Sequence, residues 1–501
     1  MRSAPAWAFL ARFRSEAETR LKSSRPSRPG RRSVVLLLAG ALVALGFAAS
    51  LVADYPGHFT PDSVWQLAQG REAVFNDWHP PVMAWLLGVA DRMAPGAWPF
   101  VVGDAVLFYG ALLAFVALEK RPRPACLPLL VLWMISPVVL LYQGVVLKDV
   151  LFADTALAGF AALAWAGKTW TRPRVRNVLL LLALALLSVA GLARQNGSIA
   201  ALCGAGALAA IIFFQPTPEG MLRGKRLRRA AATGLLGLAA IVLAETGATW
   251  VLESHGDHKP QNANHVKFLQ AYDLAGIVHQ DSSAPLPVLD REQPHLAAFI
   301  RLRAAPRYHA ASADNLNALP DRAMMMSPGG ALGRQWAQVV LARPFAYLQL
   351  RAAVWRNTFM TPSADDCPLF FVGVEDEGAP AMLRRAGLEP RYDDKDDWDN
   401  DYGDAFTPTP LFSHAFYALV LAVAMILGLW RWRRGDRSPG LIATLALGLA
   451  ALLVTASYLV ISIACDYRFL YFLDVAAMVA ATREAAARGC RSPSADFPLK
   501  T

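Results

Sequence analysis

Long apolar runs with few charged side chains alternate with short polar connections along most of this chain. The first run, Ser33–Ala53, has no charged residue over 21 positions. As a helix it would rise about 30 Å, the thickness of a bilayer hydrocarbon core. The sequence predicts ten such spans. The other nine are Pro99–Leu118, Ala125–Gln143, Val145–Gly167, Asn177–Ala193, Ser198–Phe214, Ala231–Val251, Pro410–Trp430, Pro439–Ile463 and Phe469–Ala481.

Composition supports this class of protein. Hydrophobic residues make up 55% of the 501 positions and charged residues 18%, which is too apolar for an ordinary soluble chain of this length. We therefore predict an all-α polytopic membrane protein with about ten transmembrane helices. It should also have interfacial helices in the first outer loop and a larger outer segment before the eighth helix.

The positive charge predicts the orientation of the helices. Residues 1–32 carry nine Lys or Arg against two acids, and residues 120–124, 168–176, 223–229 and 431–437 are also basic. These are alternate connections, and basic residues in short loops stay cytoplasmic. Both termini are therefore predicted to be cytoplasmic. A net charge of +10 scattered in this way fits a nucleic-acid partner poorly.

The same reasoning divides the chain. Residues 1–32 and 483–501 are predicted cytoplasmic tails, 33–251 holds helices one to seven, and 410–482 holds helices eight to ten. The basic N-terminal tail is too long for a typical cleaved signal peptide. An organellar transit peptide is the lower-ranked alternative. Two long segments remain outside, residues 54–98 and 252–409.

The first outer loop begins with a predicted helix. Thr60 has the character of an N-cap, Pro61 suits the first helical position and Gly70 is the predicted stop. Asp62 falls in the opening turn, where the helix dipole favours a carboxylate. Asp62 is therefore either an ordinary first-turn acid or a functional one. An apolar face predicts that the helix lies flat on the membrane, and it comprises Val64, Leu67 and Ala68.

Other polar clusters fall at the outer ends of spans. Lys148-Asp149 follows the third span, Arg194-Gln195-Asn196 links the fifth and sixth, and Asp466-Tyr467-Arg468 links the ninth and tenth. The first loop adds Asp77 and His79 in an Asp-Trp-His-Pro-Pro turn. A single cluster could simply close a turn, with its charges snorkelling to the interface. Their common side of the membrane favours a shared site.

The segment 252–409 is less informative. His255, His258 and His265 fit no metal-binding spacing and are predicted to lie in a solvated loop. Residues Gln335–Met360, which include Arg343, Arg351 and Arg356, resemble a basic amphipathic helix on the outer leaflet that is suited to contacting lipid phosphates. Residues Asp393–Asp404 are predicted to form a solvated acidic loop, with cation binding as the less favoured alternative.

The five cysteines do not form a disulfide scaffold. Cys126 and Cys490 are predicted on the cytoplasmic side, and Cys203 lies within a span. Only Cys367 and Cys465 fall outside. These two either form a bridge or remain free thiols, and free thiols are the simpler interpretation.

Four sequence elements resemble the integral-membrane glycosyltransferases of the C superfamily, especially the branch with lipid A aminoarabinose transferases and protein O-mannosyltransferases. They are Asp62, Gln69-Gly70, His79-Pro80-Pro81-Val82 and Asp466-Tyr467-Arg468-Phe469-Leu470. The last two are similar to the family's (His/Lys)-Pro-Pro-Leu and Arg-Tyr-Leu-Leu-Pro segments. This chain departs from the family at Ser63, where a second acid often follows the first-loop Asp, and at Phe469 and Tyr471.

The resemblance implies a polyprenyl-phosphate sugar donor and a lipid, glycan or protein acceptor. It also implies transfer on the periplasmic side of a bacterial inner membrane. Asp62 would be the base, with Asp77 or His79 as helper. Lys148, Arg194 and Arg468 would bind the donor phosphate. No cofactor is certain, although a divalent metal between Asp62 and the Asp77/His79 turn is an open alternative.

Two other functions remain open. A transporter or flippase would place ionisable residues at mid-membrane depth, and Asp104, Asp154 and Asp474 lie in or near predicted spans. A ligase or polymerase of surface polysaccharide would use outer arginines but would not need the Asp62 helix. The sequence names neither the sugar nor the acceptor.

Overall fold

The structure is a computed structural model that describes residues 31–75, 80–216, 222–254, 264–326, 329–361, 367–374 and 380–487. Within these residues the chain is almost entirely helical. Extended pairing is limited to isolated bridges, including His58 with Val145 and Phe59 with Val374. The prediction of an all-α polytopic membrane protein is confirmed.

Seven of the described helices are long and apolar enough to cross a membrane. An eighth span results if the bent pair α6 (Cys126–Met134) and α7 (Pro137–Leu140), extended by η1 (Tyr142–Gly144), is counted as one. The seven are α2 (Arg31–Asp54), α5 (Trp98–Ala117), α8 (Lys148–Lys168), α9 (Pro173–Ala193), α11 (Arg223–Ser254), α20 (His414–Arg433) and α21 (Pro439–Ile461).

The other two predicted spans are shorter helices. They are α10 (Ser198–Phe214, 17 residues) and α22 (Tyr471–Ala486, 16 residues). At 1.5 Å per residue each rises about 25 Å, less than a typical hydrocarbon core. Most of α22 is buried inside the bundle. It therefore packs as a core helix against α20 and α21.

The predicted third span, Ala125–Gln143, is not one continuous helix. Its two parts meet at an angle of 60°. The break lies at Ser136-Pro137, where Ser136 is extended and Pro137 starts the next helix. Proline has no backbone N–H and disfavours a helical residue before it, which accounts for the break.

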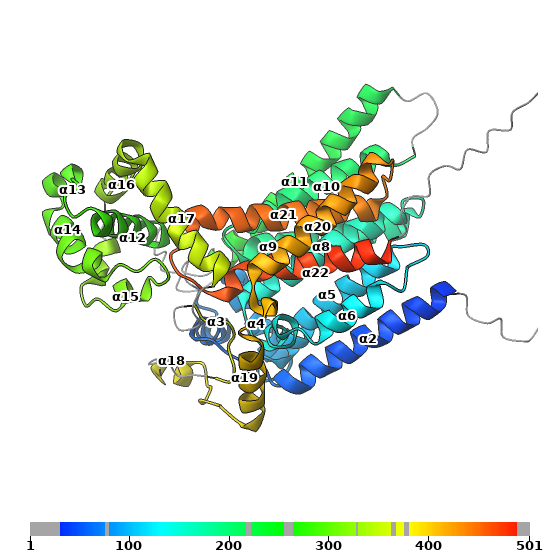
Figure 1. The fold of residues 1–501 in the computed structure, drawn as a ribbon, viewed down its shortest axis with the longest axis horizontal. Coiled ribbons are helices and arrows are strands. Elements are labelled where there is room, and N and C mark those ends of the chain that lie inside the picture. Colours follow the sequence, from blue (N-terminus) through cyan, green and yellow to red (C-terminus); the bar gives the residue numbers. More distant parts are fainter. Residues whose placement is uncertain are drawn as a thin grey trace, which may run out of the picture.

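Figure 1 shows the long helices side by side in one bundle, with a smaller group of helices beyond one end. This group spans residues 264–361 and has its own hydrophobic core, which includes Tyr272, Leu286, Ile300 and Leu350. Its helices are α12 (Asn264–Gln280), α13 (Pro287–Glu292), α14 (Pro294–Phe299), η2 (Ile300–Ala304), η3 (Ala305–Arg307), α15 (Asp314–Asn317), η4 (Arg322–Met326), α16 (Ala331–Ala342) and α17 (Pro344–Met360).

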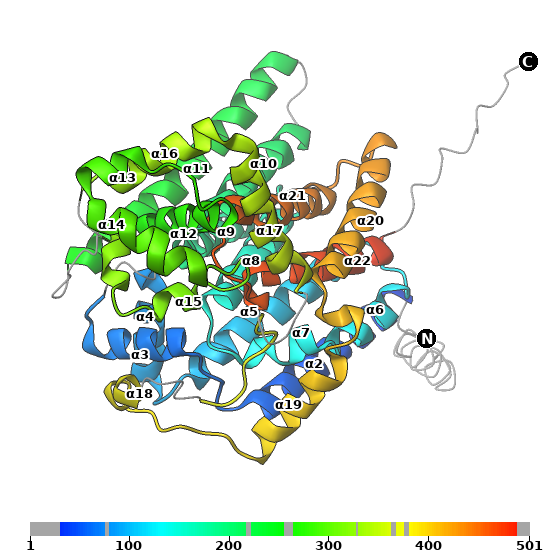
Figure 2. The same cartoon turned by 60° about the vertical axis from the view of Figure 1, so that its left-hand side comes forward.

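At the same end of the bundle, four more helices lie below this group in Figure 2. They are α3 (Pro61–Glu72), α4 (Pro81–Met93), α18 (Pro380–Arg385) and α19 (Asp394–Phe406). Helix α18 packs on α3, and α19 packs on α2 and α7. Two short helices, η5 (Pro410–Phe412) and η6 (Tyr467–Leu470), precede α20 and α22.

The predicted first-loop helix is present, but Gly70 does not end it. Thr60 caps α3, with its side chain accepting the Ser63 N–H, and the helix continues to Glu72. A Cβ on Gly70 would lie 2.1 Å from the Ala84 carbonyl oxygen. Gly70 is therefore required for the close contact between α3 and α4. The predicted apolar face of α3 is buried.

Two predictions for the segment 252–409 are wrong. Residues Gln335–Met360 form two helices, which separate at Arg343-Pro344. Residues Asp393–Asp404 form a cap and most of α19 rather than a loop, because the Asp393 carboxylate accepts the N–H groups of Lys395 and Asp396. Acids at a helix N-terminus also favour the helix through its dipole.

Candidate active site

A cavity of about 250 Å³ opens where the first loop meets the ends of α8, α9 and α21. Its charged lining residues are Asp62, Lys148, Arg194 and Arg468. It is also lined by Pro80, Gln195, Asn196, His265, Phe268, Ile461, Ile463 and Phe469. The structure thus brings together four predicted site residues that lie up to 406 positions apart in the sequence.

Asp62 and Arg468 are in direct contact in this cavity. Arg468 Nη2 lies 3.0 Å from Asp62 Oδ2, and Arg468 Nε lies 2.6 Å from Asp466 Oδ2. Burial alone would lower the pKa of Arg468, but the carboxylates of Asp466 and Asp62 outweigh it and raise the pKa. The guanidinium therefore stays charged. Its Nη1 is buried with no hydrogen-bond partner among the described residues.

Two further cations complete the lining. Lys148 begins α8 and lies close enough to Asp62, Arg468 and Arg194 to interact electrostatically with each. Arg194 follows the last residue of α9 and forms an ion pair with Asp149. Three cations thus lie near Asp62. Such an arrangement suits an anionic ligand with several oxygens, such as a phosphate.

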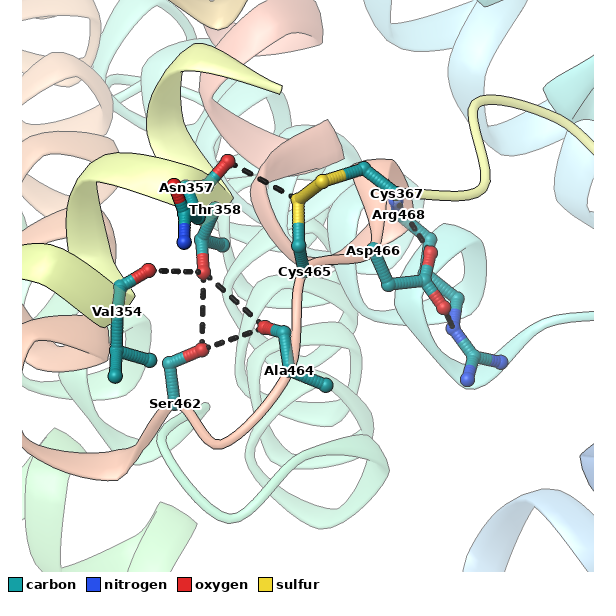
Figure 3. Close-up of a disulfide and its surroundings, with 9 residues drawn as sticks. All are labelled: Val354, Asn357, Thr358, Cys367, Ser462, Ala464, Cys465, Asp466 and Arg468. Atoms are coloured by element: carbon teal, nitrogen blue, oxygen red, sulfur yellow. Dashed lines mark hydrogen bonds and ion pairs between the residues drawn. A yellow bond between two sulfur atoms is a disulfide. The ribbon is translucent and has the colours of Figure 1, made fainter. Parts of the chain in front are cut away.

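The segment that carries Arg468 is fixed from several sides (Figure 3). Cys465 forms a disulfide with Cys367, so the bridge left open by the sequence is present. The Thr358 hydroxyl of α17 lies 3.0 Å from the Ser462 hydroxyl and donates to the Ala464 carbonyl at 3.2 Å. The Arg468 N–H then donates to Asp466 Oδ1 at 3.1 Å. These contacts hold the segment from Ser462 to Asp466, which leads to Arg468, in place.

Arg351 anchors the start of this segment. It was predicted to face lipid phosphates, but its side chain is only 1% exposed and pairs with Asp273 at 2.9 Å. The same guanidinium donates to the carbonyls of Leu459, Val460 and Ser462 at 3.0, 2.7 and 2.6 Å. These carbonyls lie at the C-terminal end of α21, where a cation satisfies unpaired acceptors. Arg351 thus joins the small helical group to the site.

Two predicted helpers, Asp77 and His79, lie outside the described residues, as do His255 and His258. His265 was predicted to lie in a solvated loop. It instead lies on α12 and lines the cavity. No spacing rule could have found it, because α12 reaches the cavity only through the packing of the small helical group.

A second cavity of about 500 Å³ adjoins the first and shares Pro80, Arg194 and Gln195 with it. It lies between α4, α9 and α11. Its other lining residues are Pro81, Gly191, Leu192, Ser198, Glu245, Thr246, Thr249 and Trp250. The neighbouring part of α11 exposes Leu243 and Trp250. An extended ligand with an anionic head and an apolar tail could therefore pass from the charged cavity to the lipid-facing surface of the helices.

A separate buried cluster lies just before α3. Asp54, His58 and Asp399 offer ligand atoms that all lie within 4.8 Å of one another. Asp396 and Arg391 adjoin His58, each 3.4 Å from its Nδ1. This cluster was not predicted from the sequence. Its only signal was the acidic run that now forms α19.

We find no protein-family model and no curated protein that matches the sequence. Among solved structures, the chain is similar to the oligosaccharyltransferase AglB from Archaeoglobus fulgidus, solved with an inhibitory peptide and a dolichol-phosphate. The identity is 12% and the TM-score 0.40, over 89% of this chain and 50% of that chain. The chain thus spans about half the length of AglB.

The chain is also similar to ArnT from Cupriavidus metallidurans bound to undecaprenyl phosphate. The identity is 12% and the TM-score 0.31, over 89% of this chain and 77% of that chain. AglB is thus named as an oligosaccharyltransferase, and both neighbours were solved with a polyprenyl-type lipid phosphate.

Proposed function

We propose that this protein is a glycosyltransferase that moves a sugar from a polyprenyl-phosphate donor to a lipid, glycan or protein acceptor at the outer face of the membrane. One observation carries the proposal. The carboxylate of Asp62 and the cations Lys148, Arg194 and Arg468 line a single cavity. A base and a phosphate-binding group are the two elements that this transfer requires.

The geometry supports separate roles for the carboxylate and the cations. An acceptor hydroxyl attacks the anomeric carbon while the bond from that carbon to the phosphate oxygen breaks. Asp62 takes the hydroxyl proton. The electron pair leaves with the polyprenyl phosphate, whose added charge is stabilised by the three cations. Arg468 contacts Asp62 directly and has a further N–H group on Nη1 for a phosphate oxygen.

The disulfide supports an outer location for the site. Cys465 lies one residue before Asp466, so the bridge is at the same end of the bundle as the cavity. Disulfides persist in oxidising compartments such as the bacterial periplasm. The basic connections after α5, α8 and α20 lie at the other helix ends, which fits a cytoplasmic location. We therefore propose a bacterial plasma-membrane protein with both termini cytoplasmic.

Gene deletion and complementation test this function. We expect the deletion strain to lack one sugar in a mass-spectrometric analysis of its surface glycans and lipids. Wild-type protein should restore that sugar, and Asp62→Asn protein at equal abundance should not. Glu72→Gln is the matched control on the same helix, because Glu72 forms only a surface ion pair with Arg385. A fully active Asp62→Asn protein would remove Asp62 from the proposed role.

A transporter or flippase is the second candidate, since Asp104 and Asp154 are buried within long helices. Each is the seventh residue of its helix, so each lies about 9 Å from the end that carries the site. Asp154 also accepts a hydrogen bond from the Gln143 side chain at 2.9 Å. Both helices are about 30 Å long, so both acids lie nearer the middle of their helices, where a transporter would place ionisable groups, than the end that carries the site. Loss of an entire polymer in the deletion strain would favour this candidate or a ligase.

A further inference from the structure

The cluster formed by Asp54, His58 and Asp399 lies outside the cavity that contains Asp62. Asp54 is the last residue of α2, His58 follows four residues later, and Asp399 lies in the middle of α19. The three side chains are at most 1% exposed. His58 Nε2 lies 3.4 Å from Asp54 Oδ1 and 3.5 Å from Asp399 Oδ2. Three ligand-type groups thus converge at one buried point.

These atoms have no other partners. Both carboxylate oxygens of Asp54, both of Asp399 and the Nε2 of His58 are buried without a hydrogen bond to any described residue. Buried polar atoms are nearly always hydrogen-bonded, because leaving one unpaired is energetically costly. Five such atoms around one point indicate a missing ligand.

The charges indicate that this ligand is a cation. Asp54, Asp396 and Asp399 contribute three negative charges, and Arg391 lies 3.2 Å from Asp396. The Gly373 N–H donates to His58 Nδ1 at 2.8 Å. Because His58 can add at most one positive charge, at least one negative charge in the cluster is left uncompensated. A cation would balance it, whereas an uncompensated buried charge is strongly unfavourable.

We propose that Asp54, His58 and Asp399 bind a divalent transition-metal cation, Zn²⁺ or Mn²⁺. An imidazole nitrogen combined with carboxylate oxygens suits these ions, whereas Ca²⁺ prefers an all-oxygen shell. Coordination through Nε2 moves the ring proton to Nδ1. Asp396 Oδ1, 3.4 Å away, then accepts it in place of the donation from Gly373. A carboxylate behind a metal-bound histidine is a frequent second partner.

The position of the site gives the cation a structural role. The His58 N–H donates to the Gly144 carbonyl at 2.9 Å, and the Val146 N–H donates to the His58 carbonyl at 3.0 Å. His58 thus joins the chain leading to Asp62 with the chain leading to Lys148. A cation bound by His58 and by Asp399 of α19 would therefore fix the position of the two chain segments that lead to Asp62 and to Lys148 in the charged cavity.

Metal content of the purified full-length protein tests the proposal. The protein should carry an affinity tag without histidines, be stripped with chelator and be equilibrated with micromolar Zn²⁺ or Mn²⁺. We expect one ion per chain by mass spectrometry, and Ca²⁺ should not displace it. Asp399→Asn should abolish binding. Asp396→Asn, which keeps the three ligands, should weaken it about tenfold. Asp401→Asn, an exposed change on α19, should bind as the wild type does.

Two results would overturn the proposal. One is a wild-type protein that binds no stoichiometric Zn²⁺ or Mn²⁺, as expected if His58 takes a second proton instead. The other is an Asp399→Asn protein that binds like the wild type. If Asp399→Asn fails to fold, X-ray absorption on zinc-loaded wild type decides, and a shell without one imidazole contradicts the assignment. These readouts do not depend on glycosyl transfer.

Discussion

Replacing Arg351 by Met tests how the small helical group supports the site. Arg351 and Asp273 form an almost fully buried ion pair, and the guanidinium also donates to three carbonyls at the end of α21. Methionine fills a similar volume but donates no hydrogen bond. The change leaves Asp273 with the Trp336 indole N–H, at 2.9 Å, and the Tyr347 hydroxyl as its remaining hydrogen-bond donors.

The expected cost comes from the unpaired charge. Removing one partner of a buried ion pair destabilises a protein by about 3–5 kcal/mol. Burial already raises the pKa of Asp273, so its carboxylate depends on Arg351 to stay charged. Adding Asp273→Asn to Arg351→Met removes the unpaired buried carboxylate and should recover about half of the lost stability. The α21 carbonyls still lack their donor, so recovery stays incomplete.

A denaturant titration of the purified protein, followed by tryptophan fluorescence, measures the free energy of unfolding. Arg356→Met is the matched control, because Arg356 is exposed on the same helix, and it should change stability by no more than about 0.5 kcal/mol. The reasoning is refuted if Arg351→Met costs no more than this control. It is also refuted if the added Asp273→Asn makes the protein less stable still.

Two further changes test the supports of the site. Replacing Cys367 and Cys465 by Ser opens a link between residues 98 apart, and a bridge that closes such a loop contributes about 4.7 kcal/mol in the chain-entropy model. The double variant should melt lower and transfer sugar more slowly, and an unchanged melting temperature would count against this view. Gly70→Ala places a Cβ 2.1 Å from the Ala84 carbonyl and should cost about 1–3 kcal/mol, with slower transfer because α3 carries Asp62. Gly40→Ala, which meets no atom within 4 Å, is its control in a thermal-unfolding assay.

Features set by local pattern could be predicted from the sequence. Apolar runs predicted the membrane helices, and Thr60-Pro61 predicted the start of α3. Gly70 was misinterpreted as a stop because a glycine ends helices often, whereas here it serves a contact with α4 that no local rule reveals. The break at Ser136-Pro137 was missed because the run stays apolar across it.

Tertiary packing accounts for the remaining differences. Arg351 lies on a basic, aromatic helix of the kind typical of a membrane surface. Its side chain is nevertheless buried, because it pairs with Asp273 and donates to carbonyls at the end of α21. The acidic run containing Asp396 and Asp399 resembled a solvated loop, but both residues are buried against His58. Contacts between residues so far apart in the chain cannot be predicted from the pattern of a single sequence. The predicted site residues Asp62 and Arg468 lie together because the first loop and the turn between α21 and α22 are on the same side of the bundle.

Donor binding and turnover, measured on the same purified variants, test the central claim most directly. The claim is that Asp62 acts as base while Arg468 and its neighbours bind phosphate. We predict that Asp62→Asn binds polyprenyl phosphate at least as tightly as the wild type, because a negative charge 3.0 Å from Arg468 is removed, but does not transfer sugar. Arg468→Met should lose both binding and transfer. Normal transfer by Asp62→Asn, or normal phosphate binding by Arg468→Met, would contradict the account.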